Sequence, residues 1–244
     1  MNIILRATCG FCKNIGEETK KLNSELSTLG EKASVSEEYG QKVYKISCDV
    51  KNAKRVKRAI VNFLLEIYCV EKKREYLYEK LDFSLSDENL RVLIETLVAF
   101  DRESDVKYAK RVLKLSENFS VDGFFNFRLK ELLTRWEGVV QITKENSVLL
   151  SDDDSFNLLL RFLLSTVKPK HDKVEIRERD NGYEVIAGQE SERIILSESE
   201  LMLKLVDIAP VEVTCAKKLR NGKLFCKLCD IFDVVGHNGV YGFS

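Results

Sequence analysis

Hydrophobic positions along the chain change their spacing twice, and each spacing predicts a different kind of structure. Residues 1–52 open with a short apolar run, NIILRA, and close with KVYKISCDV, where apolar and polar residues alternate as in a half-buried strand. Between these runs, residues 13–30 carry apolar side chains at roughly helical spacing and end at Gly30, a residue type that commonly follows a helix. The segment therefore predicts strand, helix, strand.

Residues 53–168 have a helical pattern almost throughout. The run AKRVKRAIVNFLLEIYCV places one apolar stripe on a helix, made of Val56, Ile60, Phe63, Leu64, Ile67 and Val70. Further helices are predicted to begin at Ser86, before two acidic residues, and at the acidic run 151–154, because carboxylates favour the positive end of a helix dipole. The acidic run lacks the alternating spacing of a calcium loop. Pro169 ends the last of these helices.

Residues 169–244 mix strands and helices. KVEIRERDNGYEVIAG predicts a β-hairpin, with Asn181 and Gly182 as the left-handed turn residues. A helix ending near Pro210, the strand VEVTCA and the helix GKLFCKLCDIF follow. The fold class is therefore α+β and predominantly helical, with a helical middle region flanked by small α/β elements from both termini. The three regions, 1–52, 53–168 and 169–244, could also be parts of one compact unit.

The run VDGFFNFRLKELLTRW contains four aromatic residues within sixteen positions. On a single helix over residues 121–140, Phe125, Leu129 and Trp136 share one stripe with further leucines, whereas Phe127 lies nearly opposite. This pattern predicts a core helix whose first turn is buried on both sides. A different interpretation makes Arg128 an anion or carboxylate clamp, because a guanidinium can pair with both oxygens of such a group.

The same run resembles the signature of the YtxC-like family of sporulation-associated proteins from endospore-forming bacteria. The signature positions are Gly123, Phe124, Phe127, Arg128, Leu129 and Lys130. FNLLLRFLLSTVKPKHDKVEI and LVDIAPVEV are similar to two further passages of that family, so the resemblance covers roughly residues 50–215. It implies a process, spore formation, and no catalytic residues. The two CxxC pairs of this chain depart from the family pattern.

Charge is balanced overall, with 39 Lys and Arg against 39 Asp and Glu. A general nucleic-acid binder usually shows a basic excess, so the composition does not favour that class. The sequence contains one basic cluster, formed by Lys54, Arg55, Lys57 and Arg58. Nearby glutamates could neutralise its charge. Alternatively, it could bind an anionic partner such as nucleic acid or an acidic membrane surface. Without a secretory signal or a transmembrane segment in the sequence, a cytoplasmic protein is expected.

Two CxxC pairs are the strongest chemical signals. Cys9 and Cys12 follow a predicted strand and open a predicted helix, as in dithiol oxidoreductases, although no proline lies where such folds place one. Cys226 and Cys229 form the second pair, and the four thiols together could bind zinc. Against zinc, the pairs are far apart in the sequence, and Cys229 belongs to an apolar stripe where it can pack as a small hydrophobe.

No other catalytic pattern is present. The sequence has no HExxH, no GxGxxG, no GxxxxGK[ST] and no GxSxG. No catalytic residue and no cofactor are therefore predicted, apart from the possible zinc. The expected function is that of a sporulation-associated cytoplasmic protein, more a binding protein than an enzyme, which acts through contacts with an unidentified protein partner. The alternative is a zinc-binding or thiol-redox protein.

Overall fold

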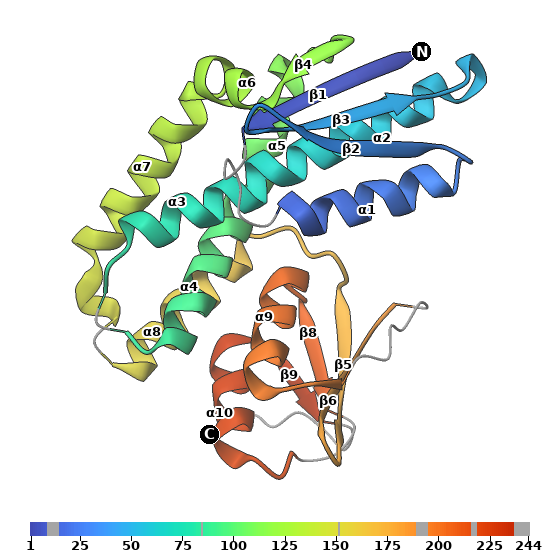
Figure 1. Cartoon of the computed structure of the whole chain (residues 1–244). Coiled ribbons are helices and arrows are strands. Elements are labelled where there is room, and N and C mark those ends of the chain that lie inside the picture. Colours follow the sequence, from blue (N-terminus) through green and yellow to red (C-terminus); the bar gives the residue numbers. More distant parts are fainter. Residues whose placement is uncertain (9–14, 84, 151, 189–194, 216–218, 237–244) are drawn as a thin grey trace. The chain divides into compact units, whose positions relative to one another are not determined.

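A computed structural model describes residues 1–8, 15–83, 85–150, 152–188, 195–215 and 219–236 (Figure 1). The chain forms two compact units. Unit 1 consists of Met1–Leu81 and Arg102–Val140, and unit 2 of Asp82–Asp101 and Gln141–Ser244. Helices predominate, and the small sheets come from the two ends of the chain, so the predicted α+β class is confirmed. Residues 53–168 contribute helices to both units.

Unit 1 contains a four-stranded sheet in the order β2-β3-β1-β4. Its strands are β1 (Asn2–Thr8), β2 (Lys32–Glu38), β3 (Gln41–Ser47) and β4 (Asn118–Ser120). β3 runs antiparallel to both β1 and β2, and β4 runs parallel to β1. Tyr39 and Gly40 join β2 to β3 with positive φ angles of 52° and 73°, which match the twist of a tight hairpin. The sequence pattern predicted neither β2 nor β4.

Helices α1 (Ile15–Ser27) and α2 (Ala53–Glu66) pack against each other and on one face of this sheet (Figure 1). A 3₁₀ turn, η1 (Val50–Asn52), precedes α2, and a π-helical segment, η2 (Ile67–Lys72), continues it into α3 (Lys73–Lys80). All six residues of the predicted apolar stripe are buried, which confirms this part of the prediction. The rest of the unit is built by α5 (Arg102–Val112), α6 (Val121–Arg128) and α7 (Lys130–Glu145) up to Val140.

A charged pair lies inside the core of unit 1. Lys73 at the start of α3 and Asp105 on α5 are almost completely buried, and Lys73 Nζ lies 3.2 Å from Asp105 Oδ2. The same oxygen accepts a hydrogen bond of 3.0 Å from Trp136 Nε1. Neither Lys73 Nζ nor Asp105 Oδ1 has a hydrogen bond in the structure. The pair is therefore held mainly by charge in a region closed to water.

Unit 2 surrounds a five-stranded sheet in the order β7-β6-β5-β8-β9. The strands are β5 (Lys173–Arg179), β6 (Gly182–Ala187), β7 (Ile195–Leu196), β8 (Glu212–Cys215) and β9 (Val234–Gly236). The helical elements are α4 (Asp87–Phe100), η3 (Ser147–Leu150), α8 (Asp153–Ser165), α9 (Glu198–Ile208) and α10 (Gly222–Ile231). β8 pairs in parallel with both β5 and β9, so this sheet is mixed.

Both predicted acidic helix starts are present in unit 2. Ser86 Oγ accepts the backbone N–H of Asn89 (3.2 Å), and Asp152 Oδ1 accepts that of Ser155 (2.9 Å). Each side chain thereby satisfies an amide that the helix leaves unpaired. The carboxylate of Asp152 is thus used as a helix cap. Ser151, the first residue of the acidic run, lies outside the described residues.

The predicted hairpin forms, but its turn differs from the prediction. Gly182 has a φ of 144°, whereas Asn181 is not in the left-handed region. A Cβ atom at Gly182 would lie 2.4 Å from the carbonyl oxygen of Leu196 on β7. The glycine is therefore needed for two reasons: its positive φ is unfavourable for other residues, and a neighbouring strand comes very close.

Candidate functional site

The signature run begins α6 with a tightly closed cap. The backbone N–H of Gly123 donates to Ser120 Oγ (3.1 Å), and a Cβ atom at Gly123 would lie only 3.0 Å from that oxygen. Glycine therefore lets the cap close without a steric clash. Asp122 Oδ2 accepts hydrogen bonds from both the backbone N–H (2.7 Å) and the hydroxyl (2.6 Å) of Thr8. The start of α6 is thus tied to the end of β1.

One side of α6 is part of the core, as predicted. Phe124 and Phe125 are buried against the ring of Tyr68, with centroid distances of 5.5 and 5.8 Å. Tyr68 belongs to the π-helical segment η2 and donates its hydroxyl to the carbonyl oxygen of Val121 (3.0 Å). Trp136 continues the cluster, 6.1 Å from Phe125. These contacts fix the orientation of α6 about its axis.

The predicted single helix over residues 121–140 is wrong, because it breaks at Leu129. This residue is fully buried and has φ −102° and ψ 17°, and it separates α6 from α7. Tyr108 on α5 donates its hydroxyl to the carbonyl oxygen of Arg128 (3.3 Å), at the break. The break leaves the carbonyl of Arg128 without a partner in its own helix, and α5 supplies the missing hydrogen-bond donor.

The predicted burial of α6 on both sides is also wrong, because the side chain of Phe127 is 83% exposed. Phe127 lies two residues after Phe125 and hence about 200° around the helix. With Phe125 facing the core, Phe127 must face away from it. No second layer covers this face among the described residues of unit 1.

Phe127 and Arg128 instead line an open cleft of about 510 Å³, which we call the α5–α6 cleft. Its lining residues are Arg111, Val112, Lys114, Phe124, Phe127 and Arg128. The cleft lies where α5 and α6 both end, and cations are favoured at the negative ends of helix dipoles. This explains locally why basic residues gather there. Lys130, the last signature position, is exposed at the start of α7 but does not line the cleft.

The cleft is strongly basic. Its lining includes three cationic side chains and no carboxylate. Within the described part of the chain, Arg111, Lys114 and Arg128 have no salt-bridge partner. Arg111 stacks on the ring of Tyr108 at 5.3 Å, and Arg135 stacks there at 5.1 Å, but Arg135 is already paired with Glu131 (2.9 Å). Three positive charges thus remain available beside an exposed aromatic ring.

Tyr108 contacts two of the residues that line the cleft, through its ring with Arg111 and through its hydroxyl with the carbonyl of Arg128. Burial, and then the neighbouring Glu131, raise the pKa of Tyr108 above its ordinary value. The hydroxyl therefore keeps its proton near neutral pH and can donate to the Arg128 carbonyl. The sequence pattern did not predict Tyr108, Arg111 or Lys114 as site residues. The close spacing of Lys107, Lys110, Arg111 and Lys114 in the sequence is a signal that could have pointed to Arg111 and Lys114.

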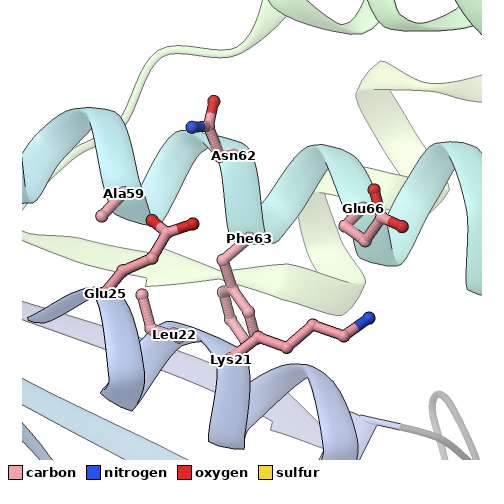
Figure 2. Close-up of a pocket in the computed structure, with 7 residues that line it drawn as sticks. All are labelled: Lys21, Leu22, Glu25, Ala59, Asn62, Phe63 and Glu66. Atoms are coloured by element: carbon pink, nitrogen blue, oxygen red, sulfur yellow. The ribbon is translucent and has the colours of Figure 1, made fainter. Parts of the chain in front are cut away.

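A second groove lies between α1 and α2 (Figure 2). Phe63 points from α2 toward Leu22 on α1 and forms the apolar floor, while Lys21, Glu25, Asn62 and Glu66 lie around it. The groove holds only about 200 Å³, and Glu66 is paired with Arg102 (2.9 Å). Since its charged groups differ in sign and are partly paired, this groove selects less strongly for a charged ligand than the α5–α6 cleft.

The thiol site predicted from the CxxC pairs gains no support. Cys9 and Cys12 lie outside the described residues. Cys226 is exposed and Cys229 is half-buried on α10, and burial, with Cys226 as a lesser cause, raises the pKa of Cys229. Among the described residues, no group of three or more His, Cys, Asp or Glu side chains could hold a metal ion. The zinc and redox hypotheses stay predictions.

Alkylation of the native protein with iodoacetamide at about pH 8 is expected to modify Cys226 and to spare Cys69. Cys226 is exposed, whereas Cys69 is fully buried and burial raises its pKa to about 12, so its thiol keeps its proton at that pH. Peptide mass spectrometry measures both sites, and the same reaction in urea is the control. Equal modification of the two cysteines in the native protein would show that the core of unit 1 is open.

The basic cluster at the start of α2 also lies in unit 1. Lys54, Arg55, Lys57 and Arg58 are exposed, and among the described residues none of them forms a salt bridge. The nearby glutamates that could have neutralised the cluster are therefore not in contact with it. The cluster lines neither the α5–α6 cleft nor the groove between α1 and α2, and it is an exposed charged surface at the start of α2.

Charge is divided very unequally between the two units. Counted over the sequence, unit 1 contains 24 Lys and Arg against 17 Asp and Glu, a formal charge of +7. Unit 2 contains 15 against 22, a formal charge of −7. The net charge of zero for the whole chain is therefore the sum of a basic and an acidic unit. The balanced composition does not disfavour anionic partners of unit 1.

Among the helices that the structure describes, none combines the length and the apolar character that crossing a lipid bilayer requires.

Comparison with known proteins adds no relative. No protein-family model matches this chain. Neither the curated proteins nor the solved structures contain a significant match. The resemblance to the YtxC-like family therefore stays a prediction from the sequence runs quoted above.

Proposed function

We propose that this protein is a non-catalytic binding protein of the cytoplasm, that it acts in spore formation, and that it recognises an anionic macromolecule through the α5–α6 cleft. The observation that carries the proposal is the exposed ring of Phe127 beside three cations without a salt-bridge partner among the described residues. Aromatic residues and arginine are enriched in recognition surfaces because both contribute much contact energy. The partner that this cleft favours therefore carries negative charge.

The sporulation part of the proposal rests on the resemblance alone, and the cleft is lined by residues of the run that carries this resemblance. The run DGFFNFRLK is one of the three passages that resemble the YtxC-like family, and its residues have two tasks. Phe124 and Leu129 pack in the core, whereas Phe127 and Arg128 line the cleft. A signature that served packing alone would not require Phe127, because an exposed phenylalanine contributes little to folding. The two cleft residues therefore fit a binding role.

The proposal is tested in an endospore-forming bacterium that carries the gene. The strain with F127A/R128A is expected to lose heat-resistant spores to the same extent as the deletion strain, while immunoblots show normal protein levels. Asn126→Ala is the matched control, since Asn126 is exposed on the same helix but does not line the cleft. A deletion strain with normal spore yield would refute the role in sporulation. Normal spore yield in F127A/R128A alone would refute the role of the cleft.

A further inference from the structure

A row of cations runs along α5 into the α5–α6 cleft. Lys107, Lys110 and Arg111 follow the spacing i, i+3 and i+4, which places them on one face of α5, and Lys114 follows two residues beyond the end of this helix. All four are exposed, and within the described residues none has a salt-bridge partner. The helix rises about 6 Å from Lys107 to Arg111, and the chain continues past its end to Lys114. The row therefore presents regularly spaced positive charge over a distance that two or three phosphates of one strand can occupy.

Phe127 adds an aromatic platform at the end of this row. Its ring is 83% exposed, and Arg128 follows it directly in the lining of the cleft. Every nucleobase has a flat face that can stack on such a ring, whereas the bases of a duplex are already stacked on one another. An acidic protein segment could also pack on the ring, but a nucleotide carries a flat base and a phosphate in the same unit, so one ligand of this kind uses the ring and the cations together. The combination thus favours a ligand with phosphates and accessible bases.

Unit 1 supplies a suitable electrostatic field. Its formal charge of +7 arises although the whole chain is neutral. A basic face along a helix, on a unit with excess positive charge, is typical of proteins that bind the phosphate backbone. The pattern of charge therefore agrees with the local geometry of the cleft.

We propose that the anionic macromolecule is a single-stranded nucleic acid, with phosphates along Lys107, Lys110, Arg111 and Lys114 and one base stacked on Phe127. This inference rests on the proposed function of the α5–α6 cleft and names its partner. The row contacts the backbone, so it gives little preference for sequence. The stacked base makes single strands better ligands than duplexes.

The test is fluorescence anisotropy of the full-length protein with labelled oligothymidylate and oligouridylate of about 15 nucleotides, a length that covers the usual site sizes. Binding is expected at low salt and should weaken steeply as salt rises. F127A is expected to weaken binding by about 5- to 150-fold, which corresponds to the loss of one stacked base. R111A/K114A should lower the slope of log K against log salt by about 1.4, since two phosphate contacts are lost. All three side chains are exposed, so folding should be unaffected, as checked by the fluorescence of Trp136.

K54A/R55A is the matched control, because it removes two exposed charges from the same unit at a place that does not line the cleft. The proposal is supported if K54A/R55A binds the oligonucleotide with nearly the same affinity as the unchanged protein. Equal loss in K54A/R55A and R111A/K114A would overturn it, since binding would then follow net charge alone. Unchanged binding in F127A, or equal binding of a duplex of the same length, would overturn the stacking role.

Failure of this inference can be told apart from failure of the proposed function. If no oligonucleotide binds at low salt while labelled polyglutamate binds and F127A/R128A releases it, the partner is an acidic protein and the inference is wrong. The proposed function would then stand. If F127A/R128A sporulates normally, the proposed function fails, whatever the oligonucleotides do.

Discussion

Replacing Lys73 by methionine is expected to lower the free energy of unfolding of unit 1 by about 3–5 kcal/mol. The substitution leaves the carboxylate of Asp105 in the core without its cation, with Trp136 Nε1–H as its remaining hydrogen-bond donor. Urea titration measures the effect. Trp136 is the only tryptophan of the chain and lies in unit 1, so its fluorescence follows the unfolding of this unit specifically.

The double variant K73M/D105N is expected to regain most of the lost free energy of unfolding. It removes both buried charges, and the amide oxygen of Asn can still accept the Trp136 hydrogen bond. Lys72→Met is the control for the single change, because Lys72 is partly exposed and its salt bridge with Glu75 (3.1 Å) should contribute at most about 1 kcal/mol. A double variant as unstable as the sum of the two single variants would show that the charges are not coupled.

Phe125→Ala and Phe127→Ala are expected to differ in stability although they lie two residues apart. Phe125 is 6% exposed and packs on Tyr68 and Trp136, so its removal should lower the free energy of unfolding by about 3–5 kcal/mol. Phe127 is 83% exposed, and its removal should change the free energy of unfolding by no more than about 0.5 kcal/mol. The same urea titration measures both variants.

The pair of variants also tests the orientation of α6. If Phe127→Ala destabilised unit 1 as much as Phe125→Ala does, the ring of Phe127 would be buried and the α5–α6 cleft would be closed. The proposal for the cleft would then lose its basis. If neither variant were destabilised, the aromatic cluster would not be part of the core.

Periodic patterns within a single element were predicted well. The stripe of α2, the cap at Ser86 and the helix start at the acidic run 151–154 depend on side chains within a few residues of each other, which the sequence shows directly. Elements held by distant partners were missed. β4 has three residues and exists because it pairs with β1, more than a hundred residues earlier. β2 has little apolar alternation and depends on its pairing with β3.

The candidate site was predicted only in part. Arg128 was considered as an anion clamp, and the structure places it in a basic cleft without a salt bridge to any described residue. Phe127 was assigned to the core because helical periodicity gives the direction of a side chain but not what lies opposite. The partners Arg111 and Lys114 come from another helix, and only the packing of α5 beside the end of α6 brings them together.

The sequence by itself determined which segments are helical, where several of them begin, and which faces are apolar, because these properties depend on neighbours within one or two turns. The tertiary structure decided how the charges are distributed. A neutral chain becomes a basic and an acidic unit because distant segments, Met1–Leu81 and Arg102–Val140, fold together. The tertiary structure also decided that Lys73 is buried and Phe127 exposed, which reverses the usual preference of both residue types. The physical reason is the same in both cases: burial is fixed by what packs against a side chain, and that partner lies far away in the sequence.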